Sequence, residues 1–140
     1  MKKWILITMM TLIFVSGCTS AKEVNDTRHI PIYMEFEQDV LNDQTKDLSF
    51  IIKNNTTQEC VYGEMFMVEK QVSDQWLELE YKEGMAFIMI GYVLNPSKQD
   101  RKSLNLSTYY HKLEPGLYRM SKTVHCDQEF KAVAEFRIVE

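Results

Sequence analysis

Residues that could do catalytic chemistry are few and scattered along this chain of 140 residues. Three histidines, His29, His111 and His125, stand far apart, and none has a second histidine or cysteine two to four positions later. The sequence contains no glycine-rich phosphate loop, no Gly-x-Ser-x-Gly turn and no His-Glu-x-x-His helix. It therefore predicts no enzyme and no cofactor. A thiol enzyme built from the adjacent His125 and Cys126 is the catalytic alternative.

Soft sulfur ligands offer a different chemistry, because methionine thioethers together with a histidine can bind Cu(I). The methionines of the presumed domain and His125 would supply such a site: Met34, Met65, Met67, Met85, Met89 and Met120. Methionine is also an adaptable filler of apolar cores, and the chain has no dense Met-x-x-Met tract. A copper-handling protein in the cell envelope is therefore one alternative function for this chain.

The chain has three cysteines, and Cys18 belongs to a signal-like segment at the N-terminus, so Cys60 and Cys126 remain as a pair. In an exported domain such a pair is the pattern expected of a disulfide, the alternative being two unrelated buried thiols. The bond would close a loop of 126 − 60 = 66 residues. In the chain-entropy description this contributes roughly 4 kcal/mol to stability.

The first eighteen residues indicate where the protein works. Lys2 and Lys3 precede a twelve-residue apolar run, which ends at Val15 before Ser16, Gly17 and Cys18. A membrane-spanning helix needs about 20 apolar residues, so the run is too short to be one. The segment resembles a bacterial lipoprotein signal peptide, whose last cysteine receives a diacylglyceryl thioether and becomes the mature N-terminus. A plain secretory signal, cleaved near Ala21, is the alternative.

This resemblance implies a signal peptide at residues 1–17, a lipidated N-terminus and polar tether at residues 18–29, and one domain at residues 30–140. The expected location is the extracytoplasmic face of the cell membrane, with the membrane as a partner through the lipid on Cys18. Without Lys2 and Lys3 the chain has 14 basic and 20 acidic side chains, and 14 − 20 gives a formal charge of −6. This charge disfavours nucleic acid and anionic headgroups as partners.

A period of two dominates the chain from Ile30 onward. Alternation predicts strands at residues 30–37, 48–53, 60–70, 76–81, 102–106, 118–124 and 130–138, separated by turns rich in Asn, Asp, Gly and Pro. Residues 85–94 form a continuous apolar run, in which periodicity does not separate a strand from a buried helix. Gly91 and the stop at Asn95 and Pro96 favour an extended, covered segment. The expected fold is all-β: an antiparallel sandwich of seven to eight strands in a Greek-key order.

Residues 113–118 add a local signature of this fold. Pro115 and Gly116 form a tight turn before a strand that opens with Tyr118. The arrangement is similar to the tyrosine corner of Greek-key sandwiches, in which the phenol donates to backbone a few residues upstream. The sequence therefore predicts a structural role for Tyr118.

Several short motifs resemble those of the small bacterial immunoglobulin-like domains found in envelope lipoproteins. The resemblance covers about residues 45–139 and rests on residues 50–55, 62–63, 66, 68–69, 76, 95–96 and 115–119. These motifs are structural, so the resemblance implies a fold and no reaction. We therefore expect a noncatalytic module that binds a protein, peptide or glycan.

An immunoglobulin-like order would bring residues 54–59 and 124–129 to the same pole of the sandwich. A Cys60–Cys126 bond would then join neighbouring loops, unlike the bridge between sheets in antibody domains. Rigid loops lose less entropy on binding. The residues predicted to form a contact pole are Asn54, Asn55, Thr56, Gln58, His125, Asp127 and Gln128.

Overall fold

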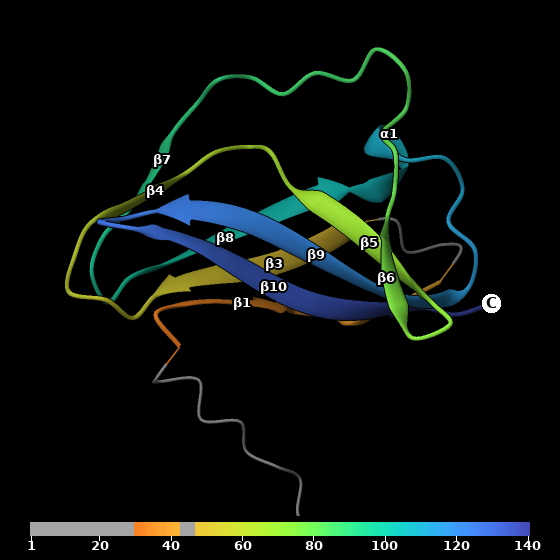
Figure 1. The fold of residues 1–140 in the computed structure, drawn as a ribbon, viewed down its shortest axis with the longest axis horizontal. Helices are drawn as coiled ribbons and strands as arrows, with labels where there is room; N and C mark the ends of the chain where they lie inside the picture. Colours follow the sequence, from red (N-terminus) through yellow and green to blue (C-terminus); the bar gives the residue numbers. More distant parts are fainter. Residues whose placement is uncertain (1–29, 43–46) are drawn as a thin grey trace, which may run out of the picture.

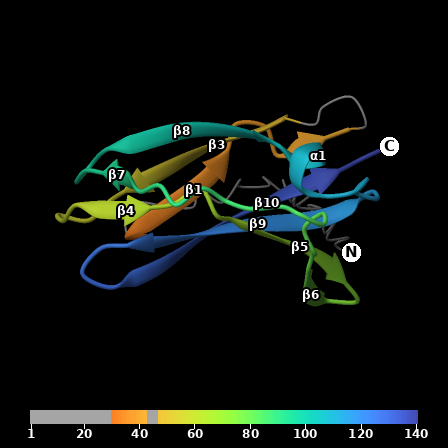
Figure 2. The same ribbon diagram turned by 90° about the horizontal axis from the view of Figure 1, so that it is seen from above.

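A computed structural model describes residues 30–42 and 47–140 of the chain, and they fold into two packed layers of strands (Figures 1 and 2). The first sheet has the order β1-β3-β8: β1 (Ile32–Phe36), β3 (Asp47–Asn54) and β8 (Gln99–Asn105). The central path of the second sheet is β2-β10-β9-β4-β7: β2 (Val40–Leu41), β10 (Glu129–Ile138), β9 (Gly116–His125), β4 (Cys60–Tyr62) and β7 (Tyr92–Leu94). β5 (Met67–Val72) also pairs with β9 and carries β6 (Gln75–Glu78). The predicted all-β sandwich is thus confirmed.

The alternation of apolar residues decides which side of each strand faces the other layer. Leu48, Phe50 and Ile52 of β3 are buried from one layer, and Met120 and Val124 of β9 are buried from the other. Every neighbouring pair is antiparallel except β2 and β10, which run parallel. Such half-buried strands expose one face to water and bury the other.

The predicted tyrosine corner is present. Tyr118 is buried, and its hydroxyl donates to the backbone carbonyl oxygen of Glu114 at 2.5 Å. Its ring stacks on Phe136 of β10, with centroids 5.4 Å apart. The bond fixes the connection between α1 (Leu106–Tyr109), a single helical turn, and the start of β9.

The strand expected at residues 60–70 is two strands, because a bulge interrupts it. β4 and β5 both pair with the same side of β9, with Tyr62 opposite Val124 and Met67 opposite Ser121. The four residues 63–66 therefore face only two residues of β9, 122–123. A bulge leaves backbone groups without partners in the ladder, and alternation alone does not show where one occurs.

The apolar run at residues 85–94 is extended, as expected, but most of it is not covered. Ile88 and Met89 are exposed, and only residues 92–94 form a strand, β7. Phe87 packs inward with its ring 5.7 Å from that of Phe66, and Leu94 at the end of the run is buried in the core. The run is long enough for a buried strand, but it crosses outside the sheets between β6 and β7, as Figure 1 shows.

Residues 1–29 lie outside the described residues, and so do the predictions that concern the signal peptide, Cys18, His29 and the tether. The boundaries 1–17, 18–29 and 30–140 remain predictions. Among the residues that the structure describes, no helix has the length and apolar character needed to cross a membrane.

Candidate functional site

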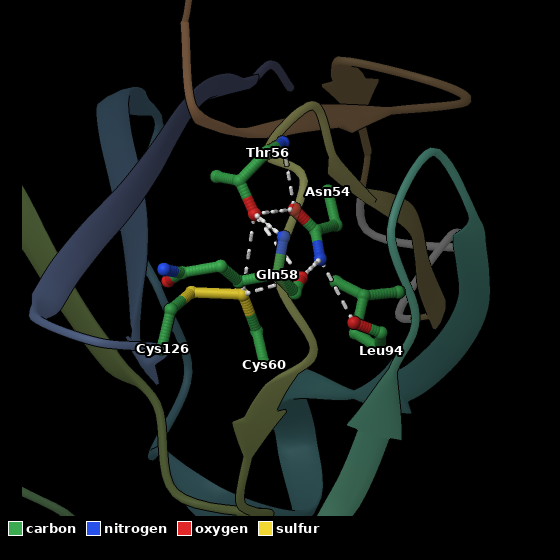
Figure 3. Close-up of a disulfide and its surroundings, with 6 residues drawn as sticks. All are labelled: Asn54, Thr56, Gln58, Cys60, Leu94 and Cys126. Atoms are coloured by element: carbon green, nitrogen blue, oxygen red, sulfur yellow. Dashed lines mark hydrogen bonds between the residues drawn. A yellow bond between two sulfur atoms is a disulfide. The ribbon is translucent and has the colours of Figure 1, made fainter.

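One end of the sandwich, on the left in Figure 1, gathers the ends of β3, β4, β7 and β9. Val61 of β4 stands opposite His125 of β9, so the preceding and following residues, Cys60 and Cys126, also face each other. Their sulfur atoms are bonded, and their Cα atoms lie 4.2 Å apart (Figure 3). The predicted disulfide is present, and it joins neighbouring strands of one sheet rather than the two sheets.

Asn54 was expected among the contact residues, and the structure corrects this. Its side chain is 0% exposed. The amide nitrogen donates to the carbonyl oxygens of Gln58 at 2.7 Å and Leu94 at 2.9 Å, and the amide oxygen accepts from the backbone of Thr56 at 2.8 Å (Figure 3). Asn54 therefore holds β3, the following turn and β7 together from inside, and cannot reach a partner.

The side chains of Asn55 and Thr56 also form hydrogen bonds that hold this loop in place. The Asn55 amide donates to the carbonyl oxygen of Ile30 at 2.7 Å, which ties the loop to the start of β1. The Thr56 hydroxyl donates to Asn54 Oδ1 at 2.7 Å and accepts from the backbone N–H of Gln58 at 3.1 Å. Both residues are half-buried, so their first role is to shape the loop.

The remaining predicted pole residues are exposed and adjacent: Gln58, His125, Asp127 and Gln128. In the orientation that satisfies both groups, the Gln58 amide nitrogen donates to Asp127 Oδ1 at 2.9 Å, across the two loops. His125 Nδ1 lies 3.7 Å from the Glu129 carboxylate. We call these four exposed residues the pole surface; it presents amides, an imidazole and a carboxylate.

A second feature was not anticipated from the sequence: Lys122 points into the core and is 4% exposed. Its ammonium donates to the carbonyl oxygens of Glu64 at 3.1 Å and Met65 at 3.0 Å, the backbone groups freed by the bulge. The pKa of Lys122 is lowered to about 8, mainly by burial, with Glu64 acting to raise it and Lys102 to lower it. A signal was available, because Lys122 occupies an inward position between Met120 and Val124 in the alternation of β9.

Family membership follows from comparison with known proteins. Residues 28–137 match the family described as bacterial Ig-like domain. The chain belongs to this family. Domains of this family are generally noncatalytic and typically extracellular or at the cell surface. The expected immunoglobulin-like fold of the chain is thereby confirmed.

Several solved structures are similar to the chain at low identity. The periplasmic chaperone SfaE is 6% identical, with a TM-score of 0.46 and coverage of 76% of this chain and 55% of the chaperone. A β-glucosidase from Listeria innocua in complex with glucose is 18% identical, with a TM-score of 0.39 and coverage of 78% and 16%. The PapD-like domain 7 of human CEP192 is 10% identical, with a TM-score of 0.37 and coverage of 100% and 97%.

The Ig-like chain spans about half of the chaperone and about a sixth of the β-glucosidase. No curated protein matches the sequence.

The thiol-enzyme alternative does not fit the geometry of the Ig-like domain. Cys126 is bonded to Cys60 and has no free thiolate to act as a nucleophile. His111 follows α1 and His125 ends β9, so these two histidines lie at opposite ends of the sandwich (Figure 1).

The copper alternative receives no support from the described methionines. Met34 and Met120 are buried as apolar core residues, while Met65 and Met89 are exposed on separate loops. Within residues 30–42 and 47–140, no group of three or more His, Cys, Asp or Glu side chains could hold a metal ion.

Proposed function

We propose that this Ig-like domain is a noncatalytic binding module, held by a lipid on Cys18 at the extracytoplasmic face of a bacterial cell membrane. It contacts a protein, peptide or glycan through the pole surface of Gln58, His125, Asp127 and Gln128. The observation that carries the proposal is the disulfide, which joins the two strands from which the pole loops emerge.

Rigidity at the pole supports binding there. A loop that is already ordered loses less conformational entropy when a partner binds. Two devices order this pole: the Cys60–Cys126 bond and the buried amide of Asn54, which bonds to both flanking segments. Exposed amide and carboxylate groups on a rigid loop can donate to and accept from polar partners such as peptide backbone or sugar hydroxyls.

The sequence at Cys18 supports the lipid anchor. Residues 18–29 would link the lipid to the start of the domain, and twelve extended residues reach at most roughly 40 Å. Two acyl chains hold a protein on a membrane without a spanning helix, at about 0.8 kcal/mol per buried CH₂. The domain would thus work close to the membrane surface.

Site-specific photocrosslinking in the cell tests the pole. A crosslinking residue at Gln128, in the pole surface, should capture a discrete neighbour. The same residue at Gln75, exposed at the start of β6, is the matched control and should not capture it. Capture of the same neighbour from Gln75 alone, or none from Gln128, would remove the pole as the contact surface.

A separate experiment tests the anchor. Cys18→Ala should leave the signal segment attached or release the protein from the membrane, whereas wild type should partition into detergent. A Cys18→Ala protein that loses its signal segment and still partitions like wild type would place the anchor elsewhere.

A further inference from the structure

A pocket of about 260 Å³ opens between the two sheets beside the bulge. Its walls come from β8 and α1 on one side and from β4, the bulge, β7 and β9 on the other. The residues that line it are Phe50, Tyr62, Gly63, Glu64, Phe66, Tyr92, Lys102, Ser103, Leu104, Asn105, Thr108, Tyr109 and Lys122. It is a set of residues distinct from the pole surface.

The Lys122 side chain, 4% exposed, lines this pocket with its ammonium. Its two hydrogen bonds go to neutral backbone carbonyls of the bulge. An ammonium has three N–H donors, so one donor remains for a group that enters the pocket. The ring centroids of Phe50, Tyr62 and Phe66 lie 5.9, 5.7 and 5.9 Å from Nζ and keep water away from much of it.

The charged side chains that line the pocket do not balance one another. Lys102 also lines it, with Nζ 3.3 Å from the centre of the Tyr92 ring, while the Glu64 carboxylate is the acidic group and accepts the Tyr92 hydroxyl. Among the lining side chains two lysines stand against one glutamate, and Asp100, whose carboxylate accepts the Tyr62 hydroxyl, lies outside the lining. A buried charge that has no partner is costly, so a ligand with one negative charge is favoured.

The other residues that line the pocket indicate the chemical character of the uncharged part of the ligand. Aromatic rings of Phe50, Tyr62, Phe66 and Tyr109 offer apolar surface, and Thr108 adds a polar residue at the α1 side. A small pocket of this kind suits an apolar body with one polar end.

We propose that the pocket binds a small organic monocarboxylate, with its carboxylate between Lys122 and Lys102 and its apolar body against the aromatic walls. A bound carboxylate accepts the remaining N–H of Lys122 and neutralises the charge that the bulge carbonyls leave unpaired. Lys122 then has two roles, because it satisfies the bulge in the free protein and recognises the anion in the complex.

Titration calorimetry with phenylacetate tests the proposal on the full chain in an uncharged detergent. Phenylacetate should bind, whereas 2-phenylethanol, which keeps the ring and lacks the charge, and inorganic phosphate, which keeps the charge and lacks the ring, should bind at least about tenfold more weakly. Equal binding of 2-phenylethanol or of phosphate, or no binding of phenylacetate at millimolar concentration, would overturn the proposal.

Variants separate recognition from folding. Lys102 is half-buried and, unlike Lys122, does not donate to the carbonyl oxygens of the bulge. Lys102→Met should therefore keep the fold and weaken phenylacetate binding by about tenfold. Lys131→Met, on the exposed face of β10, removes the same charge outside the pocket and should leave binding unchanged. Equal loss in both variants, or none in Lys102→Met, contradicts a specific site.

The pH dependence of phenylacetate binding and the pKa of Lys122 test the role of Lys122 itself. The charged or titratable groups around it are Glu64, Lys102, Tyr62 with its partner Asp100, Tyr92 and Tyr109. The phenols of Tyr62 and Tyr92 have pKa values raised above the ordinary 10.0. Affinity for phenylacetate should fall as the pH rises through about 8, because the ammonium loses its proton. Saturating phenylacetate should raise the pKa of Lys122, read from its ¹³Cε chemical shift. An unchanged pKa in the saturated protein would place the ligand elsewhere.

Discussion

The hydroxyl of Tyr62 donates to the carboxylate of Asp100 at 2.9 Å, and this bond joins β4 of one sheet to β8 of the other. Tyr62 is 1% exposed, and the carboxylate raises its pKa together with burial. Tyr62 also lines the pocket that contains Lys122, so the bond joins the two layers at the wall of that pocket.

Removal of this hydroxyl should destabilise the domain. We expect Tyr62→Phe to lower the free energy of unfolding by about 1–3 kcal/mol, because the hydrogen bond involves a charged acceptor that then loses its partner. Denaturant titration measures the loss. Tyr33→Phe is the matched control, since Tyr33 donates to Glu35 on the exposed face of β1, and it should change stability by less than about 0.5 kcal/mol. Equal losses in both variants would contradict a specific cross-sheet role.

The disulfide closes a loop with a sequence separation of 66 residues. Replacing Cys60 and Cys126 together with alanine should lower the free energy of unfolding by roughly 4 kcal/mol, chiefly because the unfolded chain gains freedom. Denaturant midpoints with and without a reducing agent measure this. Reductant should destabilise wild type and leave the double variant unchanged; a wild type that does not respond to reductant would show that the bond is absent.

Arg119 and Glu69 form a paired contact on neighbouring strands, with Nε 2.6 Å from one carboxylate oxygen and Nη2 2.9 Å from the other. Arg119 also lies 4.5 Å over the Trp76 ring. The hydrogen bonds lower the pKa of Glu69 below its ordinary 4.5, so the carboxylate stabilises the fold above that pH. This contribution is lost as the pH falls through the lowered pKa.

Glu69→Gln should therefore cost about 1–3 kcal/mol at pH 7, and the difference from wild type should shrink at pH 3. Unfolding at both pH values measures the difference. Glu80→Gln, at an exposed position, should show neither effect. A difference between Glu69→Gln and wild type that stays constant with pH would rule out the ionised pair as its cause.

Met120 and Met89 test burial with one residue type. Met120 is 0% exposed in the core, so Met120→Ala should cost about 2–5 kcal/mol through lost contacts and a cavity. Met89 is exposed, so Met89→Ala should change stability by less than about 0.5 kcal/mol. Thermal unfolding of both variants checks this, and a large loss for Met89→Ala would mean that residues 85–91 are covered in solution.

Sequence reasoning succeeds where the determining interaction is local or strictly periodic. The turn at Pro115 and Gly116 lies within four residues of the phenol that it positions, so the Tyr118–Glu114 bond is predictable. Alternation along β3 and β10 similarly predicts their inward residues, because successive side chains of a strand point to opposite faces.

Sequence reasoning fails where the position of a side chain depends on a segment that is distant along the chain. Asn54 resembles an ordinary turn residue, and only the approach of Leu94 makes its amide a buried crosslink. The apolar run at residues 85–91 has the composition of a buried strand, but the fold places no layer over Ile88 and Met89.

The sequence by itself determined the strand periodicity and the corner at Tyr118, because each depends on residue type and spacing along the chain. It favoured the pairing of Cys60 with Cys126, and the structure, which brings the two strands together, decided it. Tertiary structure alone decided that Lys122 faces a bulge and a pocket. The bulge at residues 63–66 exists only where β4 and β5 meet β9, and its free carbonyls turn a lysine in the core from an unpaired charge into a bonded one.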